Sequence, residues 1–162
     1  SVHQTVDRRL QHRRGSVSLA ILLQEEGLLD RAIIYATDIN PDALEAAAQD
    51  LRALGAQAVL LKGGHLPGDW VVDVLSMPGA PQAHKLQSPR IATHNGHGTG
   101  CTLSSAIAAH LALGLPLQQA VEQARSYILG AIAAGADVTT GRGHGPLNHG
   151  YAPIAQRVFE NS

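Results

Sequence analysis

Aromatic residues and lysine are scarce in this chain. Aromatic side chains make up 3% of the 162 residues, and the two lysines are Lys62 and Lys85. The charge is balanced, with 12 basic and 13 acidic residues. A chain with few aromatics and no excess of positive charge lacks a stacking platform and a broad basic surface, which argues against nucleic-acid binding. The rarity of lysine also makes the position of each one informative.

The sequence also lacks the features of secreted and membrane proteins. Its single cysteine, Cys101, cannot form an internal disulfide, which favours a reducing compartment. No apolar run reaches membrane-spanning length, and no signal-peptide pattern opens the sequence. We therefore expect a cytoplasmic protein with no membrane partner. Because 44% of the residues are hydrophobic and 15% are charged, the chain can bury a core within one domain.

The first half of the chain alternates apolar runs with a helical pattern. Asn40, Pro41 and Asp42 form a typical helix start and predict a helix to residue 54, followed by a buried parallel strand at 58–62. Strand candidates at 70–77 and 83–87 are separated by a Pro-Gly turn, which predicts a hairpin.

Two longer helices are predicted in the second half. One runs from about Gly98 to Leu113, with Leu103, Ile107 and Leu111 on its apolar face, and the next begins at Pro116. An earlier strand is predicted within the run RAIIYA, and the tail YAPIAQRVF is expected to form a last short element. Helices that alternate with apolar strands favour an α/β fold with a largely parallel sheet.

The most informative stretch is THNGHGTGCTLSSAIAAHL, residues 93–111, in which a glycine-rich turn leads into a helix. The first amide groups of a helix have no partner inside it and carry the positive end of its dipole. Glycines let the backbone come close to a ligand, so this turn is suited to binding phosphate. Cys101 lies in the same field, which favours a thiolate. An anion-binding turn beside the reactive thiol of Cys101 indicates phosphoryl transfer.

Other interpretations of this turn remain open at the level of sequence. It is neither a GxxxxGK[ST] loop nor a complete dinucleotide fingerprint. The spacing of His94, His97 and Cys101, with His144 or His149 as a fourth ligand, would suit a metal site, although paired cysteines are absent and the glycines stay unexplained. Glycines are also common in plain loops, and a lone cysteine is most often a small buried hydrophobe.

Two further segments accompany the turn. Lys62 ends an apolar run directly before Gly63, and in open α/β sheets ligands bind at the carboxyl ends of strands. A lysine there would neutralise phosphate oxygens, while the alternative is a solvated surface lysine. The segment GRGHGPLNH, residues 141–149, is either a plain loop or a second wall of the site, because its glycines permit close backbone approach.

Three segments resemble the hydroxymethylpyrimidine/phosphomethylpyrimidine kinases of thiamine biosynthesis, which belong to the ribokinase-like superfamily. They are KGGHL at 62–66, HGTGCTLSSAIAA at 97–109 and GHGPLNH at 143–149, and the resemblance covers about residues 40–152. It implies a ribokinase-like three-layer α/β/α sandwich, of which this chain carries the C-terminal half.

The resemblance also implies a reaction. This is the ATP- and Mg²⁺-dependent phosphorylation of 4-amino-5-hydroxymethyl-2-methylpyrimidine and then of its monophosphate. Cys101 is implied to be the catalytic base, and the GTG turn an anion hole for the phosphoryl group. The residues implied to bind the cofactor are Lys62, Gly63, His97, Gly98, Thr99 and Gly100. The metal ligands are left open.

The near alternative is a pyridoxal kinase, because those enzymes share the GTG turn. The alternative from another class is a non-catalytic domain that binds a nucleotide or a phosphorylated ligand.

The sequence departs from the family in several ways. Family members are much longer, and their N-terminal half carries the residues that grip the pyrimidine. No Asn-x-x-Glu motif for Mg²⁺ precedes residue 40, and Gly96 stands where the family usually has threonine. We therefore expect a divergent segment at 1–39 and the C-terminal part of a kinase domain at 40–162. We also expect little catalysis by this chain alone, and association into a homo-oligomer or with a missing N-terminal segment.

Overall fold

The computed structural model describes residues 33–37, 47–49, 51–53, 56–64 and 67–155. They fall into two compact units, one that ends at Arg90 and one that begins at Ile91. Each unit is described by itself.

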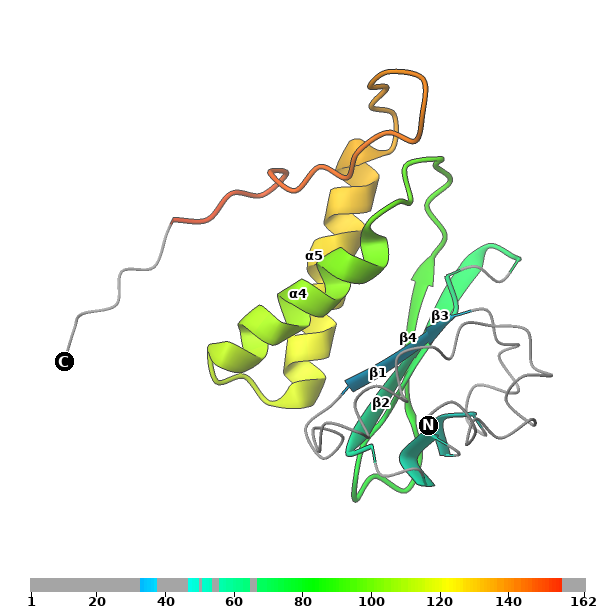
Figure 1. The fold of residues 1–162 in the computed structure, drawn as a ribbon, viewed down its shortest axis with the longest axis vertical. Coiled ribbons are helices and arrows are strands. Elements are labelled where there is room, and N and C mark those ends of the chain that lie inside the picture. Colours follow the sequence, from blue (N-terminus) through cyan, green and yellow to red (C-terminus); the bar gives the residue numbers. More distant parts are fainter. Residues whose placement is uncertain (1–32, 38–46, 50, 54–55, 65–66, 156–162) are drawn as a thin grey trace, which may run out of the picture. The chain divides into compact units, whose positions relative to one another are not determined.

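The first unit contains a four-stranded sheet in the order β1-β2-β3-β4 (Figure 1). The strands are β1 (Ile33–Thr37), β2 (Ala58–Lys62), β3 (Trp70–Ser76) and β4 (His84–Pro89). β1 runs parallel to β2, whereas β2 and β4 both run antiparallel to β3. The expected hairpin and the parallel strand at 58–62 are therefore confirmed.

The expectation of a largely parallel sheet is wrong for the described strands. The connection 63–69 between β2 and β3 is shorter than the dozen or so residues that a parallel crossover needs. The connection 77–83 between β3 and β4, which contains Pro78 and Gly79, is equally short, so it too joins antiparallel neighbours. Short connections thus decide the strand directions in this unit.

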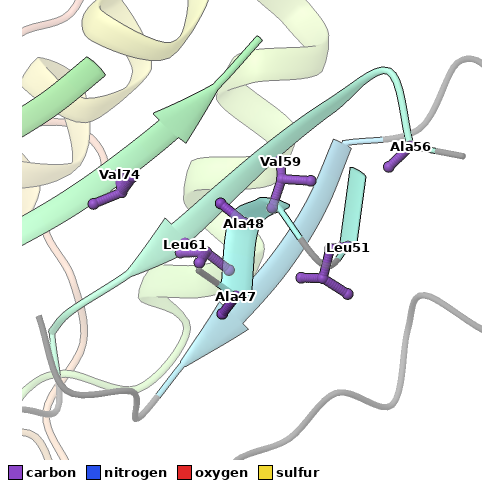
Figure 2. Packing of buried hydrophobic residues seen from close by; sticks show 7 residues of the cluster. All are labelled: Ala47, Ala48, Leu51, Ala56, Val59, Leu61 and Val74. Atoms are coloured by element: carbon purple, nitrogen blue, oxygen red, sulfur yellow. The ribbon is translucent and has the colours of Figure 1, made fainter. Parts of the chain in front are cut away.

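Small apolar side chains form the core of the first unit (Figure 2). The cluster combines β2 and β3 with helical residues at 47–49 and 51–53, and its members are Ala47, Ala48, Leu51, Ala56, Val59, Leu61 and Val74. In β2 the first four residues are buried, so both faces of this strand are covered. The predicted helix start at Asn40 lies outside the described residues.

The second unit is built from two helices that pack against each other, α4 (Thr99–Ala112) and α5 (Leu117–Gly135). Leu103 and Ile107 are the buried residues of α4, and α5 buries Val121 among others. Both predicted helices are confirmed. Leu111, which was expected on the buried face, is 38% exposed, because it lies in the last turn of α4 where the chain leaves the helix.

No helix or strand is found after α5 as far as Ala155, so the expected C-terminal element does not form there, and residues 156–162 lie outside the described range. Among the described helices, none has both the length and the apolar composition needed to cross a bilayer.

Candidate active site

The helix α4 begins at a glycine in the left-handed conformation. Gly98 is the N-cap, with φ 85° and ψ −2°, a backbone geometry that strains residues with a Cβ atom. The carbonyl oxygen of Gly98 accepts a hydrogen bond from the N–H of Thr102 at 2.9 Å. The sequence therefore uses glycine here to bend the chain directly into the first helical turn.

The amide groups that open α4 have no acceptor among the residues that the structure describes. Inside a helix, the N–H groups of Thr99, Gly100 and Cys101 would need carbonyl groups that precede the helix. No side chain caps this end of α4, and its first turn contains no acidic residue. Within the described part of the chain, no other acceptor reaches these amides. The positive end of the helix dipole is thus left uncompensated, as an anion site requires.

Cys101 lies in this first turn and is exposed. Its side chain borders an open cleft with a volume of about 430 Å³, within the range of small-molecule sites. The cleft is lined by Cys101, Thr102, Ser105, Ala106, Tyr127 and His149. A thiol and two hydroxyl side chains from one helix therefore face a space that a small ligand can enter.

The far side of the cleft is held together by Tyr127 and His149. The Tyr127 hydroxyl donates to the carbonyl oxygen of His149 at 3.2 Å and lies 3.3 Å from its Nδ1 atom. The rings of Tyr127 and His149 stack with their centroids 6.4 Å apart. The ring of Tyr151 also packs against that of Tyr127, in a tilted arrangement with the centroids 5.8 Å apart. Within the segment 141–149, His149 therefore lines the cleft, and the role of the rest of the segment stays a prediction.

One residue of this region gave no signal in the sequence. Asn95 is 7% exposed, and its Nδ2 atom donates to the carbonyl oxygens of Gly135 at 2.7 Å and Val138 at 2.8 Å. Its Oδ1 atom accepts the N–H of Gly145 at 2.8 Å. The sequence T-H-N-G is typical of an exposed turn, and only the fold shows that this asparagine is buried.

Two of the predicted cofactor residues belong to the first unit. Lys62 is the last residue of β2 and is half-buried. The N–H of Gly63 donates to Oδ1 of the buried Asp73 at 3.1 Å. Arg90 donates to two carbonyl oxygens within 64–68, each at 2.6 Å. Gly63, Gly64 and Gly68 are therefore held by side chains of β3 and of the residue that follows β4.

The remaining predicted residues lie in the second unit, where His97 is exposed directly before Gly98. The alternative of a metal site built on His94, His97 and Cys101 is wrong. Among the described residues, no three histidine, cysteine or acidic side chains gather to hold a metal ion. The Nδ1 atom of His144 instead lies 2.9 Å from the backbone oxygen of His94, in a hydrogen bond.

The family model for phosphomethylpyrimidine kinase matches residues 26–148. The thiamine biosynthesis bifunctional protein ThiED of Geobacter sulfurreducens is 50% identical over 110 residues, which cover 68% of this chain and 22% of that protein. The hydroxymethylpyrimidine/phosphomethylpyrimidine kinase of Rhizobium meliloti is 42% identical over 130 residues, which cover 79% of this chain and 48% of that one. The chain thus spans less than half the length of these two relatives.

Solved structures agree on the fold. The ADP complex of Bacillus subtilis pyridoxal kinase has a TM-score of 0.70 and 31% identity, and the match covers 80% of this chain and 52% of that one. Pyridoxal kinase from Staphylococcus aureus, in complex with AMP-PCP, has a TM-score of 0.70 and 25% identity, with 82% and 52% covered. The fold is ribokinase-like, and because the family model matches most of its residues, the chain belongs to the phosphomethylpyrimidine kinase family.

Proposed function

We propose that this chain carries the phosphoryl-transfer site of a hydroxymethylpyrimidine/phosphomethylpyrimidine kinase in thiamine biosynthesis. Its substrates are 4-amino-5-hydroxymethyl-2-methylpyrimidine and the monophosphate, and ATP is the phosphoryl donor. The observation that carries the proposal is the set of unpaired amides at 99–101 beside an exposed cysteine. The names of the relatives from Geobacter and Rhizobium support the pathway and the substrate.

In the proposed mechanism the amides of Thr99, Gly100 and Cys101 bind oxygens of the transferred phosphoryl group. These donors are already in place in the folded chain, so they stabilise the charge of the transition state without reorganising. The Sγ atom of Cys101 accepts the proton of the substrate hydroxymethyl group as the oxygen of that group bonds to the γ-phosphorus. The bond from that phosphorus to the bridging oxygen breaks, and ADP leaves with the electron pair.

Lys62, Gly63 and His97 have supporting roles in this proposal. The ammonium group of Lys62 neutralises phosphate oxygens, and the fixed backbone at Gly63 lies next to it in the chain. His97 contributes a polar ring beside the anion turn. For Mg²⁺ the described residues do not offer a ligand set, because no cluster of three suitable side chains exists among them.

A second candidate function is phosphorylation of pyridoxal. It is favoured by the similarity to the pyridoxal kinases of Bacillus subtilis and Staphylococcus aureus. Comparing kcat/KM for the pyrimidine and for pyridoxal separates the two candidates, since each predicts a clear preference for its own substrate. A non-catalytic binding domain would phosphorylate neither compound.

The test of the proposed function replaces Cys101 with alanine and follows ATP-dependent phosphorylation of the pyrimidine under single-turnover conditions, which detect the low rate expected of this chain alone. Cys101→Ala is expected to lower the rate by about 10²–10⁴-fold, as loss of a general base does, and to leave nucleotide affinity unchanged. Ser126→Ala is the matched control, because it also removes one exposed polar atom but lies on α5 outside the cleft. Equal rates for Cys101→Ala and Ser126→Ala would refute the role of the thiol.

A further inference from the structure

The segment that leads into the anion turn has no regular secondary structure of its own. Between Ile91 and Gly96 the chain is neither helix nor strand. In the described part of the second unit, the hydrogen bonds that tie residues 91–97 to other segments come from Thr93, His94 and Asn95 alone. The position of the amides at 99–101 therefore depends on how these few residues are held.

Asn95 provides most of this anchorage. Its amide group satisfies three backbone groups from segments 40 to 50 residues further along the chain, those of Gly135, Val138 and Gly145. The Oγ1 atom of Thr93 accepts the N–H of Asn95 at 3.0 Å and donates to the carbonyl oxygen of Ala136 at 2.9 Å. Since both donors and the acceptor of a buried amide are used, the side chain has one orientation in which all are satisfied.

The glycine loop is fitted to the same side chain. A Cβ atom at position 145 would overlap both the side-chain amide of Asn95 and the carbonyl oxygen of Val138, so only glycine allows this approach. Asn95 thereby links three segments at one point, the turn that leads to Gly98, the end of α5 and the loop 141–145.

We propose that Asn95 is a positioning residue for phosphoryl transfer. It acts through the backbone amides at 99–101, because it fixes the turn three residues before Gly98 and joins that turn to Gly145. This inference rests on the proposed function, since it assumes that those amides bind the phosphoryl group. In this inference Asn95 does not itself bind the phosphoryl group, but its buried side chain determines whether the amides at 99–101 point to the same ligand atom.

The experiment titrates the full chain with inorganic phosphate and follows the backbone amide resonances by NMR. In the wild-type chain, phosphate is expected to shift the amide signals of Thr99, Gly100 and Cys101. Asn95→Ala is expected to weaken this binding by about 10-fold or more, because a misplacement of about 1 Å at such a site can cost about 100-fold. An alanine is preferred to aspartate, whose charge would repel phosphate directly.

A variant of matched stability separates positioning from a general loss of folding. Val121→Ala removes buried volume from α5 about 20 Å along the helix from Gly135, and its midpoint of thermal unfolding is compared with that of Asn95→Ala. Val121→Ala should keep wild-type phosphate binding. If Asn95→Ala does not fold, Thr93→Val weakens the same anchor at nearly constant shape and should give a smaller loss of binding.

The possible results are distinct. Wild-type affinity in Asn95→Ala, or in Thr93→Val where that variant replaces it, would overturn the inference and leave the proposed function intact. An equal loss in Val121→Ala would also overturn it, because the effect would then follow stability. No shift at 99–101 in the wild-type chain would overturn the anion site and the inference together.

Discussion

The left-handed glycine before α4 can be tested by two identical substitutions that should have opposite effects. Gly98→Ala places a Cβ atom on a residue with φ 85°, whereas Gly100→Ala places it on a helical residue two positions later. In both cases the new atom meets nothing within 4 Å. The two sites therefore differ in backbone conformation, and contacts of the new Cβ atom with other segments play no part.

The magnitudes follow from the two backbone conformations. A residue other than glycine in the left-handed region costs about 1–2 kcal/mol, so Gly98→Ala should lower the free energy of unfolding by that amount. Gly100→Ala should raise it by about 0.4–1 kcal/mol, since alanine restricts the unfolded chain and suits the helix. The two variants should differ by about 2 kcal/mol, or about 4–8 °C in the midpoint of thermal unfolding.

Thermal unfolding followed by far-UV circular dichroism measures this difference. Gly98→Asn serves as an internal check, because asparagine tolerates the left-handed region and should lie between wild type and Gly98→Ala. The reasoning is refuted if Gly98→Ala unfolds at the same temperature as Gly100→Ala or above it. That result would mean that the turn does not require glycine for its conformation.

Two further stability predictions concern the packing of the second unit. Ile107→Ala should lower the free energy of unfolding in urea by about 2–5 kcal/mol, because the side chain is 1% exposed, while the exposed Ala108→Ser should change it by less than about 0.5 kcal/mol. Gly145→Ala should cost about 1–3 kcal/mol through overlap with Asn95, whereas Gly143→Ala, whose Cβ meets nothing within 4 Å, should be near neutral in the same assay. Equal values within either pair would contradict the packing described.

Much of the fold follows from local sequence signals. The apolar run at 58–62, the Pro-Gly turn before β4 and the helix that begins after Gly98 all appear where their patterns predict them. Strand direction does not follow from the apolar patterns in the same way. The apolar character of β2 reports burial on both faces, which a strand has in either a parallel or a mixed sheet. Strand direction follows instead from the short connections 63–69 and 77–83, which allow only antiparallel neighbours.

In the candidate site, too, some residues follow from local sequence signals and others only from contacts between distant segments. Glycine next to a helix start and a lone cysteine are visible as residues 98–101, because the chemistry of a helix terminus is local. Asn95 and Gly145 are not visible, since their importance arises from hydrogen bonds and close approach between segments about fifty residues apart. No periodicity or motif encodes such a contact. The placement of Lys62 relative to that turn stays a prediction.

The burial of Asn95 also bears on the chemical ageing of the protein. An asparagine followed by glycine, here Asn95 and Gly96, is the pair at which a succinimide closes most readily, because the small neighbour lets its peptide nitrogen attack the side-chain carbonyl carbon. That attack needs a freely rotating amide, and here both ends of the amide are held by backbone partners. The folded chain therefore shields its most deamidation-prone bond, and exposure of that bond on unfolding would turn the anchor into aspartate or isoaspartate.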